Sequence, residues 1–238
     1  MKQIAPLTVI TNTAHCIEPG VYLIGAGPGA SDLITVRGAR ILGNADIVFY
    51  DALIDISMLE WCPSTKLVQV GKRCGSHSSS QHFINKQLVD AAGKYSVVVR
   101  LKGGDPMIFG RAQEEIDALE KANVPYEIVP GITTALAASA ELKQPPTTRE
   151  LSRTLTLTTL PGRCAHEDHK TAIYYMARDQ LSEVATTLIA QGYSIDTPVC
   201  LMESVSLPSQ RSFACTLDEL RFGDVHHHFL DKQPVVVM

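Results

Sequence analysis

The glycine-rich stretch at residues 21–35, VYLIGAGPGASDLIT, has the outline of a strand that turns into a helix around a bound nucleotide. Gly25, Gly27 and Ala30 match the loose G-x-G-x-x-G/A pattern of dinucleotide-binding loops. Pro28 argues against a pyrophosphate ligand, because proline has no N–H to donate and fixes φ inside the turn. A tight turn without any ligand also favours glycine, so this stretch alone leaves the ligand open.

Similar turns follow two other expected strands, LKGGDP at residues 101–106 and VPGITT at residues 129–134. If the strands are parallel, all three turns lie at the carboxyl edge of one sheet, where open α/β sheets bind ligands. Glycines at this edge let a ligand approach the backbone, and Asp105 can accept hydrogen bonds from a ribose or an ammonium group. Asp46 or Asp51 lies near the distance expected for a ribose-binding acid.

Strands and helices alternate along the first half of the chain, which predicts an α/β fold with a mostly parallel sheet. We expect strands at residues 20–27, 46–51, 66–73, 95–105 and 125–131, and helices at residues 33–45, 79–94, 111–123 and 132–142. The fourth strand is apolar without alternation, which is typical of a strand buried on both faces of a parallel sheet.

The second half is expected to form a smaller α/β domain, because the polar, proline-containing residues 143–153 interrupt the pattern. Strands are expected at residues 154–160, 171–177, 197–204 and 233–238, with a helix at residues 181–192. We therefore predict two α/β domains with mostly parallel sheets. Their bounds are an N-terminal arm at residues 1–18, a first domain with the glycine turns at residues 19–144 and a second domain at residues 145–238.

The composition excludes several classes of protein. Of the 238 residues, 45% are apolar and 19% are charged, as in globular proteins, and the net charge of −4 argues against a nucleic-acid binder that relies on bulk positive charge. No apolar run approaches the roughly 20 residues of a membrane helix, and the N-terminal residues lack a signal-peptide core. The six cysteines have neither disulfide nor metal-ligand spacing, so we expect a reduced, cytoplasmic protein without a bound metal.

Five segments together resemble the tetrapyrrole methylase family, in particular its members that methylate uroporphyrinogen III. They are GAGPGASDLITVRGARIL at residues 25–42, ADIVFYDALI at 45–54, VGKRCGSHSSSQHFIN at 70–85, VVVRLKGGDPMIFGRAQEE at 97–115 and VPGITTALAASA at 129–140. The similarity is strong from about residue 20 to residue 140 and weak beyond it. VRLKGGDPMIFGR together with VGKR is far more specific than a single glycine loop.

The resemblance implies a homodimer of two-domain subunits, with S-adenosylmethionine bound in a bent form in the cleft between the domains. It also implies transfer of two methyl groups to ring carbons of uroporphyrinogen III, giving precorrin-2 and S-adenosylhomocysteine on routes to sirohaem and cobalamin. Pro28 suits this ligand, because a sulfonium cofactor has no phosphate for the turn to bind. The residues that the resemblance assigns to the cofactor are Pro28, Gly103, Gly104, Asp105, Ile108, Thr133, Thr134, Met176 and Val205.

The same resemblance implies three catalytic residues. Asp51 matches a proton acceptor and Lys72 a proton donor, and Arg111, followed by Glu114, would orient the substrate or take part in proton removal. Without the resemblance, Asp51 could cap the next element and Lys72 could be a surface charge. Arg111 and Glu114, three residues apart at a helix start, could form a surface ion pair.

The substrate carries many carboxylates, so its site needs cations, and guanidinium groups bind carboxylates in a bidentate manner. Arg111, Glu114 and Arg149 are the substrate-binding residues that we predict. The wider set of candidate cations is Lys72, Arg73, Lys102, Arg111, Arg149 and Arg153.

Three departures from the family pattern lie in the second half. Thr148 stands where a histidine is usual, residues 158–170 form a shorter segment than in the family, and Val205 stands where a glycine is usual. These departures leave two alternatives open. One is a methylase that acts on another tetrapyrrole or on a different substrate, and the other is a non-catalytic cofactor-binding homologue.

Overall fold

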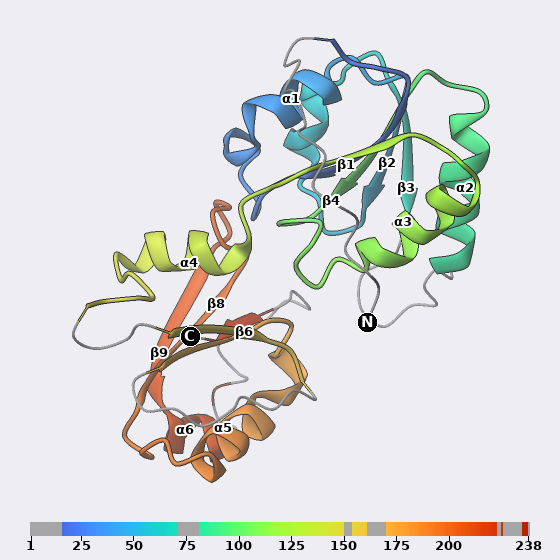
Figure 1. The fold of residues 1–238 in the computed structure, drawn as a ribbon. Helices are drawn as coiled ribbons and strands as arrows, with labels where there is room; N and C mark the ends of the chain where they lie inside the picture. Colours follow the sequence, from blue (N-terminus) through green and yellow to red (C-terminus); the bar gives the residue numbers. More distant parts are fainter. Residues whose placement is uncertain are drawn as a thin grey trace.

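The computed structural model describes residues 16–70, 81–149, 154–160, 170–222, 225 and 235–237. These residues form two β-sheets, each covered by helices on both faces (Figure 1). Within the described ranges, no helix has both the length and the apolar character needed to cross a membrane.

The first half contains a five-stranded sheet of order β3-β2-β4-β1-β5, in which every pair is parallel, as predicted. Every residue of β4 is buried, as expected for a strand covered on both faces of a parallel sheet. The strands are β1 (Gly20–Gly25), β2 (Ile47–Asp51), β3 (Lys66–Val70), β4 (Val97–Lys102) and β5 (Tyr126–Val129).

Alternate residues of β1 point into two separate cores, one on each face of the sheet. Tyr22 and Ile24 pack on the face covered by α1 and the 3-10 helix η2, whereas Val21 and Leu23 pack on the face covered by α2 and α3. These elements are α1 (Val36–Leu42), η2 (Ile56–Trp61), α2 (Gln81–Ala92) and α3 (Ala112–Lys121).

The two central strands, β1 and β4, lie side by side, but the chain leaves them in opposite directions. From β1 it passes through α1 to β2, and from β4 it passes through α3, on the other face, to β5. Such a pair is a topological switch point, the place where open α/β sheets bind ligands. The turns that follow β1 and β4 therefore have the position of a binding site.

The second sheet has the order β6-β7-β10-β8-β9, and only β6 and β7 are parallel among its described pairs. The prediction of a mostly parallel sheet thus holds for the first sheet and is wrong for the second. Residues 204–210, which join β8 to β9, are too few for the crossover that a parallel pair requires. The strands are β6 (Thr154–Thr158), β7 (Lys170–Tyr174), β8 (Pro198–Glu203), β9 (Arg211–Thr216) and β10 (Val235–Val237).

Helix α4 (Thr134–Leu142) packs on the second sheet, although it precedes the predicted domain boundary. Its residue Ala138 lies in one buried cluster with Met202 of β8. Helices α5 (Leu181–Ala190) and α6 (Leu217–Phe222) cover the opposite face of this sheet (Figure 1). The chain therefore passes from the first sheet to the second directly after β5.

Candidate cofactor and substrate site

The turns that follow β1 and β4 are joined by backbone hydrogen bonds at the switch point. The N–H of Gly104 donates to the carbonyl oxygen of Gly27 at 2.7 Å, and the N–H of Gly27 donates to the carbonyl oxygen of Gly104 at 3.2 Å. Both residues have left-handed backbone conformations, with φ of +82° at Gly27 and +65° at Gly104. Glycine adopts such conformations without steric cost, so the turn itself requires it at these two positions.

The turn that follows β5 packs against the first two. A Cβ on Gly131 would lie 2.3 Å from the carbonyl oxygen of Gly104 and 2.8 Å from the Cα of Gly25, so no side chain fits there. Gly103 differs, because a Cβ there would have no atom within 4 Å and its φ is not in the left-handed region. Neither packing nor conformation requires glycine at 103, and the exposed backbone of this residue fits the close approach of a ligand.

Asp105 holds the second and third turns together. Its Oδ2 accepts a hydrogen bond from the N–H of Gly131 at 3.0 Å, and its Oδ1 accepts one from the N–H of Met107 at 2.8 Å. Both carboxylate oxygens are therefore engaged with the backbone. The predicted contact of Asp105 with a cofactor stays a prediction, and the structure adds a second role in shaping the turns.

Loops of the second half contact the first glycine turn. The N–H of Ala30 donates to Oγ of Ser206 at 2.9 Å. Gly29 lies so close to the same loop that a Cβ on it would stand 2.7 Å from the carbonyl oxygen of Val205. Val205 is buried in the cluster formed with α4, and the whole residue is only 2% exposed, so its contact with a cofactor stays a prediction.

A second contact between the halves centres on Tyr175, which directly follows β7. Its hydroxyl lies 2.7 Å from Oγ1 of Thr133, and its ring meets the ring of Phe109 edge to face at 5.2 Å. Thr133 is the N-cap residue of α4, and Thr134 is the first residue of that helix. Thr133, Thr134 and Met176, the residue after Tyr175, were predicted from the sequence, whereas Tyr175 was not.

Backbone strain gathers in these same loops. Of the non-glycine residues with positive φ among the described positions, Asn123 and Lys143 follow helices, where such a conformation is common. The others lie in the loops around the glycine turns, and strained residues of this kind cluster at functional sites. They are Phe109, Arg111, Met176, Ser204 and Ser206.

The remaining predicted cofactor residues lie around the same turns. Pro28 is half-buried in the first turn, and Ile108 and Met176 are exposed in spite of their apolar side chains. Exposed apolar groups beside an open glycine backbone can contact the adenosine and thioether parts of a cofactor. This assignment remains a prediction for each residue.

Asp51 ends β2 at the carboxyl edge of the first sheet, where its side chain is 31% exposed. Its Oδ1 accepts a hydrogen bond from Nη2 of the buried Arg100 at 2.5 Å. Asp51 does not cap the following element, because Asp55 is the N-cap of η2 and accepts from the N–H of Ser57. Asp46, the other acid considered for a ribose, bonds backbone amides at the start of β4, on the amino edge, and does not serve the site.

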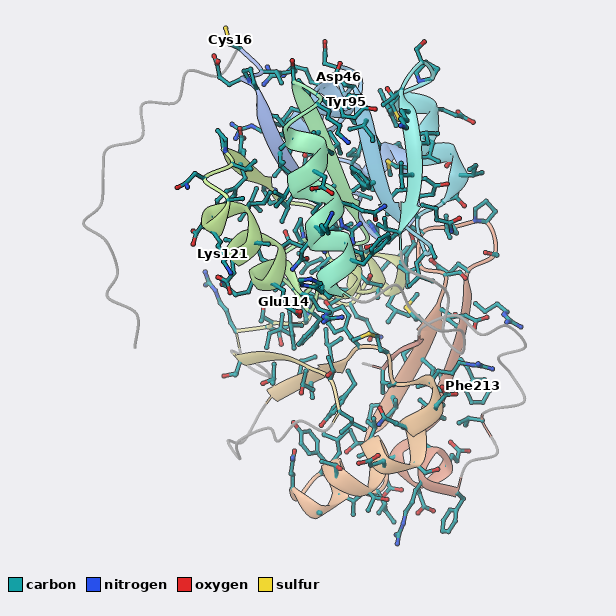
Figure 2. The ribbon with its side chains drawn as sticks, turned by 90° about the vertical axis from the view of Figure 1, so that its right-hand side faces the viewer. Cys16, Asp46, Tyr95, Glu114, Lys121 and Phe213 are labelled. Atoms are coloured by element: carbon teal, nitrogen blue, oxygen red, sulfur yellow. The ribbon has the colours of Figure 1, made fainter. Side chains whose placement is uncertain are left out.

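Arg111 and Glu114 form an exposed bidentate ion pair at the start of α3. The Arg111 Nε and Nη2 donate to the two Glu114 oxygens at 2.7 and 2.8 Å, and the side chains are 60% and 48% exposed. This hydrogen bonding raises the pKa of Arg111 and lowers the pKa of Glu114. In Figure 2, Glu114 lies at the end of the first half that faces the second half, whereas Asp46 and Tyr95 lie at the opposite end.

The other five predicted cations have different outcomes. Arg149 is exposed beyond α4, and Lys72, Arg73 and Arg153 lie outside the described residues. Lys102 is buried, and its Nζ donates to both oxygens of Glu115 at 3.0 Å, so the prediction that it binds substrate carboxylates is wrong. Burial and the nearby Arg100 guanidinium lower the pKa of Lys102.

Three buried side chains and the partly exposed Asp51 form what we call the buried charge cluster. Its members are Asp51, Arg100, Lys102 and Glu115. Arg100 donates from Nε to Glu115 at 3.0 Å, and Gln81 adds a hydrogen bond to Glu115 at 3.1 Å. Burial opposes the charge of Arg100, but the carboxylates of Asp51 and Glu115 outweigh it and raise its pKa. Sequence reasoning missed Arg100 and Glu115, and the available signal was a pair of cations inside an otherwise apolar strand.

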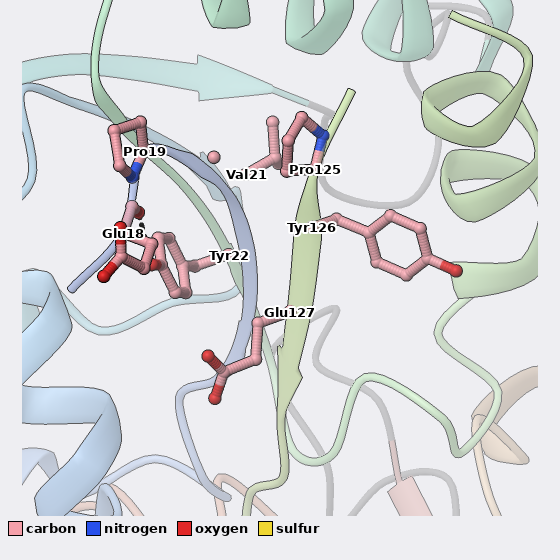
Figure 3. Close-up of a pocket in the computed structure, with 8 residues that line it drawn as sticks. Glu18, Pro19, Val21, Tyr22, Pro125, Tyr126 and Glu127 are labelled. Atoms are coloured by element: carbon pink, nitrogen blue, oxygen red, sulfur yellow. Dashed lines mark hydrogen bonds between the residues drawn. The ribbon is translucent and has the colours of Figure 1, made fainter. Parts of the chain in front are cut away.

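A separate pocket of about 120 Å³ lies at the amino edge of β1 and β5, away from the glycine turns (Figure 3). Its lining includes Glu18, Tyr22 and Glu127, and the Tyr22 hydroxyl donates to the carbonyl oxygen of Glu18 at 2.5 Å.

The described residues contain no group of three or more His, Cys, Asp or Glu side chains placed to hold a metal ion.

The fold and the three joined turns define a class of α/β protein with a ligand site at the switch point, and comparison with known proteins gives the family. Residues 20–221 match the model of the Tetrapyrrole (Corrin/Porphyrin) Methylases. The chain belongs to this family, which confirms the resemblance found in the sequence.

Two relatives are similar over most of their lengths. A Uroporphyrinogen-III C-methyltransferase of Pseudomonas aeruginosa is 41% identical, over 84% of this chain and 85% of the relative. One of Cyanidium caldarium is 37% identical, over 90% and 88%. A Siroheme synthase of Pseudomonas aeruginosa is 39% identical over 87% of this chain, which spans only 47% of that protein.

Among solved structures, a uroporphyrin-III C-methyl transferase of Thermus thermophilus complexed with S-adenosyl homocysteine superimposes with a TM-score of 0.78. The two proteins are 31% identical, and the match covers 92% of this chain and 96% of that one. A cobalt precorrin-4 methyltransferase superimposes with a TM-score of 0.76 at 26% identity.

Proposed function

We propose that the protein is an S-adenosylmethionine-dependent C-methyltransferase that transfers two methyl groups to uroporphyrinogen III and forms precorrin-2. The observation that carries the proposal is the meeting of three glycine turns at the switch point, with the backbone of Gly103 open to a ligand. The names of the relatives at 41% and 37% identity support this substrate, and the homologue bound to S-adenosyl homocysteine supports this cofactor.

The cofactor, when bound, supplies an electrophilic methyl group on a sulfonium centre. Its nucleoside and amino-acid parts are best held by backbone groups and short polar side chains, and the turns at Gly103 and Gly104 and the start of α4 at Thr134 offer these. The backbone of Val205 and the exposed Met176 would contact the cofactor from the second half. Fixing the methyl group in line with a ring carbon is the main catalytic task, since methyl transfer depends on orientation.

A proton must leave the macrocycle after each ring carbon is methylated. We assign Asp51 as its acceptor, because the carboxylate is partly exposed at the same edge as the glycine turns and is held by Arg100. Lys72 is the assigned proton donor by family resemblance. Arg111, Glu114 and Arg149 are the assigned substrate-binding residues, since the exposed guanidinium groups of the two arginines suit a ligand rich in carboxylates.

We further propose that the protein acts as a homodimer in the cytoplasm and serves sirohaem or cobalamin synthesis. Free cysteines at positions 16, 62, 200 and 215 are consistent with a reducing compartment. The relation to a Siroheme synthase supports the first of the two routes.

One incubation tests the proposal. Purified protein, S-adenosylmethionine labelled in its methyl group and freshly reduced uroporphyrinogen III should give a macrocycle that carries two labelled methyl groups by mass spectrometry. A reaction without the macrocycle is the control. No label above this control would refute the proposal. Label transfer only when a methylated corrin precursor replaces uroporphyrinogen III would indicate a different methylase of the family.

A further inference from the structure

Arg100 is placed to act on the site without reaching the substrate. Its side chain is only 3% exposed, and each of its three guanidinium nitrogens donates a hydrogen bond: Nη2 to Asp51, Nε to Glu115 and Nη1 to the carbonyl oxygen of Leu101. A planar group with three fixed partners cannot rotate freely. The carboxylate of Asp51 is therefore held in one place at the end of β2.

Glu115 connects the same buried charge cluster to the first turn of α3. Its carboxylate is fully buried and accepts hydrogen bonds from Arg100 and Lys102, both on β4. Arg111 immediately precedes α3, and Glu114 lies in its first turn. Because Glu115 anchors this turn to the sheet, it also fixes where the Arg111–Glu114 pair stands.

The chemistry of the cluster argues for a positional role. It contains two carboxylates and two cations, so its charges balance, as buried ionic groups require. Well-packed apolar residues in such a place are often as stabilising as a buried ion pair or more so. A contribution to stability alone therefore does not explain why these charged residues lie beneath the site.

We propose that Arg100 and Glu115 are positioning residues that hold Asp51 and the Arg111–Glu114 pair in one geometry against the same substrate. This inference rests on the proposed function, which assigns Asp51 and Arg111 to the methylation of a tetrapyrrole. It assigns to Arg100 and Glu115 no contact with either the substrate or the cofactor.

Arg100→Lys is the variant that tests the inference, because lysine keeps the charge but cannot bond three partners in the geometry of the guanidinium. The kcat for methylation of uroporphyrinogen III should fall about 10-fold or more, as expected for a displaced catalytic group. The KM for uroporphyrinogen III and the Kd of S-adenosylhomocysteine should change less than about two-fold. Lys86→Gln, which breaks an exposed ion pair with Asp90 on α2, is the matched control and should leave kcat unchanged.

A double-mutant cycle separates a positioning role from a general loss of stability. In the Asp51→Asn background, the loss of kcat caused by Arg100→Lys should shrink to less than about three-fold, because the residue acts largely through Asp51. Equal losses in both backgrounds would overturn the inference. Wild-type turnover of Asp51→Asn alone would instead overturn the role proposed for Asp51.

A crystal structure of Arg100→Lys gives a readout that does not depend on the substrate. The side chain of Asp51 or the first turn of α3 should be displaced relative to the wild-type protein, and unchanged positions of both would overturn the inference. If a melting curve shows that Arg100→Lys is unfolded, Glu115→Gln, which keeps the size of the side chain, should give the same kinetic and structural changes.

Discussion

Alanine substitutions in two of the glycine turns should separate stability from ligand binding. In Gly131→Ala the new Cβ would lie 2.3 Å from the carbonyl oxygen of Gly104, a backbone atom that cannot rotate away. Overpacking of this kind costs about 1–3 kcal/mol, and we expect a loss near the upper end because two further backbone contacts, both with Gly25, fall below 3 Å. In Gly103→Ala the Cβ meets no atom within 4 Å. The free energy of unfolding should therefore stay unchanged or rise by about 0.4–1 kcal/mol, through the smaller freedom of the unfolded chain.

Affinity for S-adenosylhomocysteine should instead fall in Gly103→Ala, the variant that keeps its stability. The methyl group of Gly103→Ala would occupy the side of the turn that we assign to the cofactor, and a loss of about 10-fold in affinity corresponds to about 1.4 kcal/mol. Guanidinium denaturation measures the stability of both variants, and calorimetric titration with S-adenosylhomocysteine measures the affinity of Gly103→Ala. Wild-type affinity of this variant would show that the cofactor does not approach the turn. Wild-type stability of Gly131→Ala would refute the packing argument.

Changes at five other residues have defined outcomes. Asp51→Asn should slow methylation about 100-fold, the scale for loss of a positioned acid or base, with unchanged affinity for S-adenosylhomocysteine, and a wild-type rate would contradict its role. Lys72→Met should slow the same reaction, and recovery of the rate in Lys72→Arg would assign the residue to substrate carboxylates rather than to proton transfer. Arg111→Lys should lower kcat/KM for uroporphyrinogen III about 10-fold because the bidentate fork is lost, and full activity at limiting substrate would remove Arg111 from the site. Asp105→Ala should lower the free energy of unfolding by about 2 kcal/mol, because two amide hydrogen bonds to a carboxylate are lost, and an unchanged denaturation midpoint would argue against this. Burial raises the pKa of the Cys215 thiol from 9.0 to about 11, so the unfolded chain ionises first and stability should fall as the pH rises through this range. Cys215→Ala should show a shallower fall in a pH series of melting curves, and an identical fall would exclude this thiol as its source.

The first sheet could be predicted from the sequence because its central strands are long apolar runs between glycine turns and helices. The strand order could not, since pairing joins residues far apart in the chain. Strand β9 was not predicted because its apolar and polar residues do not alternate clearly. Its less exposed face carries Arg211 together with Phe213 and Cys215. Arg211 is placed there by an ion pair with the buried Glu203 of the neighbouring strand, which only the fold reveals.

The site was predictable to the extent that local geometry determines it. Glycine at positions 27 and 104 reflects the backbone conformation of its own turn, so the sequence locates these turns. Arg100 and Glu115 were missed because their pairing joins a strand and a helix. A cation within a strand predicts no role as long as its partner is unknown. Lys102 was predicted among the cations for substrate carboxylates, whereas the structure places it inside, paired with the carboxylate of Glu115.

A crystal structure of the protein with S-adenosylhomocysteine tests the central claim most directly. The ligand should lie against the backbone of Gly103 and Gly104, and the backbone of Val205 should contact it from the second half. A ligand bound elsewhere, for example in the pocket beside Tyr22, would contradict the assignment of the three glycine turns as the methyl-transfer site.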